Sequence, residues 1–202
     1  PIRPGDIMIL TPRREPFASE IIRRLKELNV PVAGADRIRL TQQIGVMDLI
    51  ALGRFALLPE DDLNLASLLR SPLLGFTEND LYALAQPRKG GLWRELVARS
   101  GENAQFTAAH AHLAQVLKRA DYAPPYEFYA HALVARGMRA RLLARLGADA
   151  ADAIEEFLSL ALAHEAGAPP SLAGFLDWIG RGGAEIKRYM ERGRNEGRVM
   201  TV

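Results

Sequence analysis

Cysteine is absent from the 202 residues, and so are the segments that mark secretion or membrane insertion. The N-terminus shows no basic stretch followed by an apolar one, and no apolar run approaches the roughly 18 residues that suggest a membrane span. Because nothing supports an oxidising or membrane environment, we expect a cytoplasmic protein that does not enter a membrane.

Known catalytic signatures are missing as well. The sequence has no G-x-x-x-x-G-K-[ST] phosphate loop, no G-x-G-x-x-G and no G-x-S-x-G. His110 and His112 are two residues apart, which places them on different sides of a helix, and no cysteine is present to complete a zinc site. We therefore expect neither a catalytic centre nor a metal site within these residues.

Lysine is scarce, occurring only four times, so that the positive charge is carried by arginine. The net charge is +2 and the isoelectric point about 9.1. Arginine favours phosphate recognition through its planar fork, but GC-rich coding produces the same bias. Composition alone therefore does not decide whether the protein binds nucleic acid.

The two ends of the chain have the pattern of a parallel α/β domain. Residues 6–11 form a short apolar run typical of a strand buried on both faces, 17–28 have helical periodicity, and 29–33 suggest a second strand. The last residues, 197–202, also have a strand pattern and would rejoin the same sheet. The chain ends inside this strand, so we expect it to be a piece of a longer protein.

Everything between these ends is expected to be helical. Pro59, the pair Pro124-Pro125 and the pair Pro169-Pro170 separate helices, and Thr77 with Asp80 forms a capping-box variant. The fold class predicted is mainly α, with a large helical domain inserted into a partial α/β domain. The helices are expected at 42–58, 60–70, 77–85, 92–99, 104–120, 126–135, 139–146, 150–166, 172–179 and 184–192.

Arg13 and Arg14 stand just beyond the carboxyl end of the first expected strand, where open α/β sheets place their ligands. An arginine there can hold a phosphate through two parallel hydrogen bonds. The alternative is that Arg13 and Arg14 lie in a solvated turn and bind no ligand.

Four segments carry a family resemblance. Residues 6–14 and 28–37 resemble the motif IV region of superfamily 1A (UvrD/Rep-like) DNA helicases, and 44–58, with Asp48, is similar to the next helix of that family. Residues 59–76 look like the stretch that follows. The matches are ordered and correctly spaced.

Later segments resemble the AddA subunit of AddAB helicase-nucleases, in its alphaproteobacterial form. They are residues 153–161, 170–179 and 184–188, and residues 198–202 resemble the start of motif V. The resemblance implies a first part of domain 2A at 1–40, a helical 2B-like insertion at 41–192, and a return strand to the RecA-like 2A domain at 193–202.

The resemblance implies an ATP-dependent 3′ to 5′ DNA helicase that acts in double-strand break repair and recombination. ATP and Mg²⁺ would serve the full-length protein, while this fragment alone would be inactive and bind neither. Its partners would be DNA, single-stranded and at duplex junctions, and an AddB-like subunit. The alternatives are another UvrD- or RecB-like helicase, or a non-catalytic helical interaction module.

Site residues also follow from the resemblance. Arg13 or Arg14 would contact the ATP phosphates, although Pro12 stands where the family usually has arginine. Gly75, Thr77 and Thr201 would contact nucleic acid. The segment at 72–77 begins a helix, as in relatives that bind duplex phosphates, but it lacks their second glycine, so buried packing is an equal alternative there. We expect weak, salt-sensitive DNA binding at most.

Overall fold

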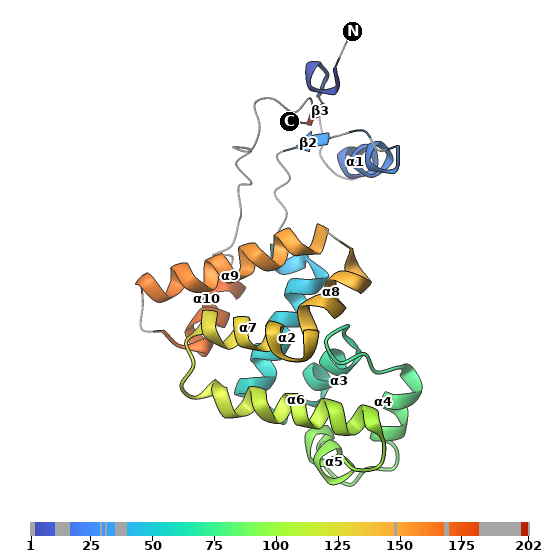
Figure 1. Cartoon of the computed structure of the whole chain (residues 1–202), viewed down its shortest axis with the longest axis vertical. Helices are drawn as coiled ribbons and strands as arrows, with labels where there is room; N and C mark the ends of the chain where they lie inside the picture. The colour runs from blue at the N-terminus through green and yellow to red at the C-terminus, as the bar shows by residue number, and fades with distance from the viewer. Residues whose placement is uncertain are drawn as a thin grey trace. The chain divides into compact units, whose positions relative to one another are not determined.

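The computed structural model is mainly helical and divides into two compact units (Figure 1). It describes residues 3–10, 17–28, 30, 32–34, 40–147, 149–167, 170–181 and 199–201. Unit 1 comprises Pro1–Ile38 and Glu185–Val202, and unit 2 is the continuous segment Arg39–Ala184. The sequence-based boundaries lie after residues 40 and 192.

Unit 1 contains a small parallel sheet. The short turn η1 (Pro4–Asp6) leads into β1 (Met8–Ile9), which is followed by α1 (Phe17–Glu27), β2 (Val32–Gly34) and, from the far end of the chain, β3 (Val199–Thr201). The strand order is β1-β3-β2, and Met200 of β3 lies opposite both Met8 and Ala33. The last strand therefore lies between the first two.

The expectation that the first strand is buried on both faces is wrong. Ile7, Met8 and Leu10 are 46%, 58% and 72% exposed. The cause is the small extent of the unit, in which α1 packs chiefly against β2. An apolar strand is thus left open to solvent.

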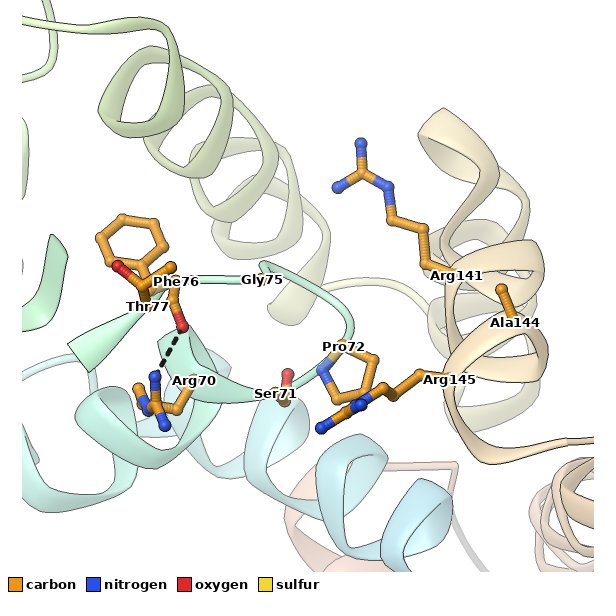
Figure 2. Close-up of a pocket in the computed structure, with 9 residues that line it drawn as sticks. All are labelled: Arg70, Ser71, Pro72, Gly75, Phe76, Thr77, Arg141, Ala144 and Arg145. Carbon is orange, nitrogen blue, oxygen red and sulfur yellow. Dashed lines mark hydrogen bonds between the residues drawn. The ribbon is translucent and has the colours of Figure 1, made fainter. Parts of the chain in front are cut away.

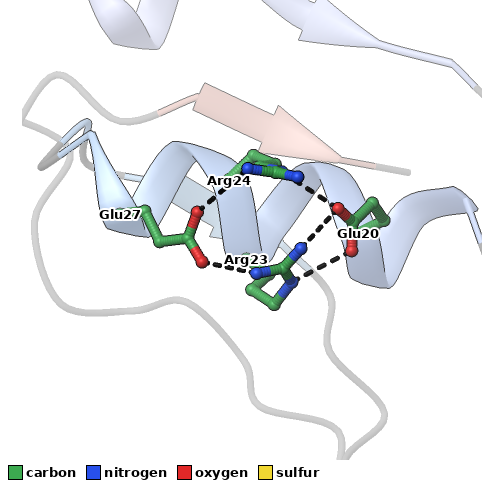
Figure 3. A network of polar contacts seen from close by, with 4 residues as sticks. All are labelled: Glu20, Arg23, Arg24 and Glu27. Carbon is green, nitrogen blue, oxygen red and sulfur yellow. Dashed lines mark hydrogen bonds and ion pairs between the residues drawn. The ribbon is translucent and has the colours of Figure 1, made fainter.

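The outer face of α1 carries a network of ion pairs (Figure 3). Arg23 and Arg24 both bind Glu20, and both also pair with Glu27 one turn later. The hydrogen bonds from Arg23 and Arg24 lower the pKa of Glu20. Pairs of this spacing on an exposed helix stabilise it only slightly, so the network supports α1 without determining its fold.

Unit 2 is built entirely of helices in its described part, close to the predicted ranges. The predicted helix at 184–192 lies outside the described residues. The helices are α2 (Ile44–Leu57), α3 (Asp62–Arg70), α4 (Glu78–Ala85), α5 (Leu92–Ala98), α6 (Ala104–Ala120), α7 (Pro125–Val134), α8 (Met138–Leu146), α9 (Asp149–Gly167) and α10 (Leu172–Gly180), with 3₁₀ turns η2 (Leu40–Gln42) and η3 (Ala135–Gly137).

Polar side chains fix where several of these helices begin. Asp61 caps α3 by accepting from the Asn64 N–H, and Ser171 caps α10 by accepting from the Gly174 N–H. Asp62 accepts from the Leu92 N–H at 2.6 Å and pairs with Arg88, so it ties α3 to the start of α5. The acid pair Asp61-Asp62 therefore has a structural role.

The core of unit 2 forms around α2. This helix contacts α3, α6, α8, α9 and α10, and it is apolar on nearly all sides, as a helix at the centre of a bundle must be (Figure 1). On α7, Tyr129 packs edge-to-face against Phe128 and Phe157, with ring centroids 5.0 and 4.8 Å apart. Phe175 of α10 completes this aromatic cluster against Phe157.

Candidate nucleic-acid interface

The turn between α3 and α4 holds two of the residues predicted to contact nucleic acid, Gly75 and Thr77. Gly75 has a φ of +69°, a left-handed conformation that glycine adopts without strain. Its N–H donates to the Ser71 carbonyl oxygen at 2.7 Å. Phe76, which follows, is buried and stacks on Phe106 of α6 with 5.6 Å between ring centroids. The turn is therefore anchored by packing on one side.

Thr77 begins α4 through a reciprocal capping box. Its hydroxyl group accepts from the Asp80 N–H, and the Asp80 carboxylate accepts from the Thr77 N–H at 2.8 Å. The Thr77 hydroxyl group also donates to the Asp80 carboxylate at 2.6 Å, and this hydrogen bond, with the one from the Thr77 N–H, lowers the pKa of Asp80.

The backbone N–H groups of the turn are thus used within the chain. The N–H of Gly75 donates to Ser71, that of Phe76 to the Leu69 carbonyl at 2.9 Å, and that of Thr77 to Asp80. A phosphate held by these amides would have to displace an existing acceptor. Side chains are the groups that remain to bind an anion here.

A pocket of about 580 Å³ opens beside this turn (Figure 2). One wall is the end of α3 with the turn, and the other is α8. Three arginines and no acidic residue lie in its lining, which consists of Arg70, Ser71, Pro72, Gly75, Phe76, Thr77, Arg141, Ala144 and Arg145.

The three arginines differ in how they are held. Arg70 donates to the Phe76 carbonyl oxygen at 3.0 Å and pairs with Glu78 at 2.6 Å. Arg141 makes one long hydrogen bond of 3.5 Å to the Leu73 carbonyl oxygen. Arg145 has no hydrogen-bond or ion-pair partner among the described residues, and in Figure 2 its side chain extends towards Pro72. Two exposed guanidinium groups on α8 therefore lack a carboxylate partner in the described part of the chain.

No other predicted site residue belongs to the described lining of this pocket. Arg13 and Arg14 lie outside the described residues. Thr201 is in β3 of unit 1, where its backbone lies opposite Ile9 and Gly34, and its side chain is not described. Among the described residues of the predicted set, the structure brings Gly75 and Thr77 together in one turn.

The arginines of α8 are not among the site residues predicted from the sequence. The signal was present, because Arg141 and Arg145 are four residues apart and so lie on one face of a helix. What the sequence lacked was the information that this face lies across from the turn at Gly75. That neighbourhood is set by tertiary packing.

One further titratable group stands out in unit 2. Asp48 of α2 is partly buried, and its Oδ2 has no hydrogen-bond partner among the described residues. Burial raises its pKa from the ordinary 3.8 to about 6. Ionisation of the Asp48 carboxyl group therefore lowers the stability of the folded chain.

Comparison with known proteins gave no family assignment. No sequence model of a known protein family matches the chain, and no curated protein sequence matches it. Within the described residues, no group of three or more histidine, cysteine, aspartate or glutamate side chains is arranged to hold a metal ion. No helix in the described part is both long and apolar enough to cross a membrane.

Proposed function

We propose that the chain is a 2A/2B fragment of an AddA-type, ATP-dependent 3′ to 5′ DNA helicase of the UvrD/Rep superfamily. The observation that carries this proposal is the order of the sheet. In the sheet, β3 from the end of the chain lies between β1 and β2 from the beginning of the chain. In the sequence, the helical unit Arg39–Ala184 separates β2 from β3. A helical domain inserted in a parallel-sheet domain is what the resemblance implies.

The exposed apolar strand supports the same proposal. Met8 is 58% exposed and Leu10 72%, although their run is typical of a buried strand. Contiguous apolar surface of this kind commonly marks a contact with another part of a protein. In the proposed helicase, that contact is the rest of domain 2A.

The proposed mechanism assigns the two units different roles. Unit 1 would move with domain 2A as it closes on ATP bound to domain 1A, and an arginine at 13 or 14 would stabilise the charge of the transferring phosphoryl group. Unit 2 would meet DNA or the AddB-like subunit. Mg²⁺ and the phosphate loop would belong to other parts of the helicase.

ATP hydrolysis tests this proposal at two levels. The 202-residue chain is expected to hydrolyse no ATP, with or without DNA, since it lacks a phosphate loop. The full protein encoded by the same reading frame is expected to hydrolyse ATP in a DNA-stimulated manner. Replacing Arg13 and Arg14 together by alanine should reduce its kcat at least about 100-fold, because a charge-stabilising arginine acts in the transition state.

If the chain is instead a non-catalytic helical interaction module, the full protein should hydrolyse no ATP. A full reading frame without a phosphate loop upstream, and without His followed by Lys-Gly-Leu-Glu directly after Val202, would favour that module. Turnover of ATP by the 202 residues alone would contradict both readings.

A further inference from the structure

The arginines of α8 stand where a polyanion can reach them. Arg141 and Arg145 are both exposed, and they line the same pocket. Since they are one helical turn apart, their side chains start from one face of α8. Arg70 adds a third positive group from the opposite wall, fixed by Phe76 and Glu78.

The negative charges near the pocket are already engaged. Glu78 pairs with Arg70, and the Asp80 carboxylate binds both the N–H and the hydroxyl group of Thr77. Neither carboxylate contacts α8 among the described residues, and Arg141 and Arg145 have no carboxylate partner there. Like charges gathered in one pocket are unfavourable without an anion, and guanidinium groups match phosphate through paired hydrogen bonds.

We propose that Arg141 and Arg145 of α8 bind the phosphate backbone of DNA across the pocket that faces Gly75, through their side chains rather than through the amides of the turn. The amides of Gly75, Phe76 and Thr77 are satisfied internally, so the turn shapes the pocket and the arginines supply the contacts. This inference rests on the proposed function, because it takes the polyanion to be the DNA on which a helicase acts.

The test measures DNA binding by the 202-residue chain. Fluorescence anisotropy with a labelled duplex that carries a single-stranded tail gives the dissociation constant as a function of salt. The variant Arg141→Gln with Arg145→Gln removes the proposed contacts. The matched control, Lys89→Gln with Arg94→Gln, removes the same charge from exposed positions outside the pocket lining.

The pocket variant should bind the duplex about tenfold or more weakly near 50 mM salt, and its slope of log K against log salt should be shallower by about 2. The control variant should stay within about threefold of the unaltered chain. Polyglutamate at matched charge should displace the duplex poorly, because carboxylates in a flexible chain do not reproduce the spacing of a phosphate backbone. Thermal unfolding followed by circular dichroism confirms that both variants are folded.

Three results would overturn the inference. They are equal weakening by the two double variants, efficient displacement by polyglutamate, and no measurable binding of the unaltered chain at about 50 mM salt. None of these results would affect ATP hydrolysis by the full protein, on which the proposed function is tested. Conversely, if the full protein hydrolyses no ATP, the proposed helicase function is wrong. A DNA-binding result for the pocket would still hold, and the pocket would then serve a nucleic-acid-binding protein that is not a helicase.

Discussion

Tyr129 places its hydroxyl group in the core of unit 2 with no hydrogen-bond partner among the described residues. Burial of this group raises the pKa of Tyr129 far above its usual range. The hydroxyl lies against Gly53 of α2, where a Cβ atom would overlap it. A glycine is needed at 53 because the Tyr129 side chain from α7 approaches the backbone of α2 so closely.

This contact predicts a coupled pair of substitutions. Gly53→Ala should lower the free energy of unfolding by about 1–3 kcal/mol, because the new methyl group overfills the site. Tyr129→Phe should be neutral or stabilising by up to about 1 kcal/mol, since it removes an unsatisfied buried group.

Together, the two substitutions should cost less than Gly53→Ala alone, since the overlapping oxygen is gone; the Cδ1 atom of Leu176, 3.1 Å from the new Cβ, keeps part of the cost. Urea denaturation of the four proteins measures the cycle. Strict additivity would show that the hydroxyl is not the clashing atom.

Asp48 predicts a dependence of stability on pH. Its folded-state pKa of about 6 exceeds its ordinary value of 3.8, so the folded chain binds the proton more tightly. The free energy of unfolding should therefore fall as pH rises from about 4 to about 6, and level off above.

Because the group is only partly buried, the loss is of the order of 1 kcal/mol. Asp48→Asn should remove this fall and raise the melting temperature at pH 7, whereas Asp121→Asn at an exposed site should keep it. A pH profile unchanged by Asp48→Asn would show that the carboxyl group is well solvated in the folded chain.

At the start of α4, Thr77 can be explained either as a helix cap or as a contact to DNA. As a cap, Thr77→Ala should cost about 1 kcal/mol of stability, and Thr77→Ser should cost little because it keeps the oxygen. Neither substitution should weaken duplex binding by more than about twofold. Weaker DNA binding by a fully stable Thr77→Ser would instead assign the threonine to the ligand.

Most helices were predictable from the sequence, because the residue patterns that mark a helix and its first residue are local. The apolar periodicity of 104–120 predicts α6, and Ser171 and Thr77 mark the starts of α10 and α4. The pocket was not predictable, because it depends on α8 lying across from the turn at Gly75, more than 60 residues earlier. The exposure of β1 was also missed, since a buried-strand pattern says nothing about what covers the strand.

The whole molecule consists of two units, and the buried aromatic cluster belongs wholly to unit 2. Residues 39–184 are therefore expected to fold alone, with cooperative thermal unfolding and a midpoint within about 5 °C of the main transition of the 202-residue chain. Circular dichroism and calorimetry check this. A broad, non-cooperative transition of the excised segment would show that unit 2 needs unit 1 for its packing.

The central claim concerns the protein to which both units belong. Strand separation by the full protein, measured with duplexes that carry a 3′ or a 5′ single-stranded tail, tests it most directly. The proposed helicase should unwind the 3′-tailed duplex, only with ATP and Mg²⁺, and should leave the 5′-tailed duplex intact. A full protein that binds both substrates but separates neither, or that unwinds only from a 5′ tail, would contradict the account.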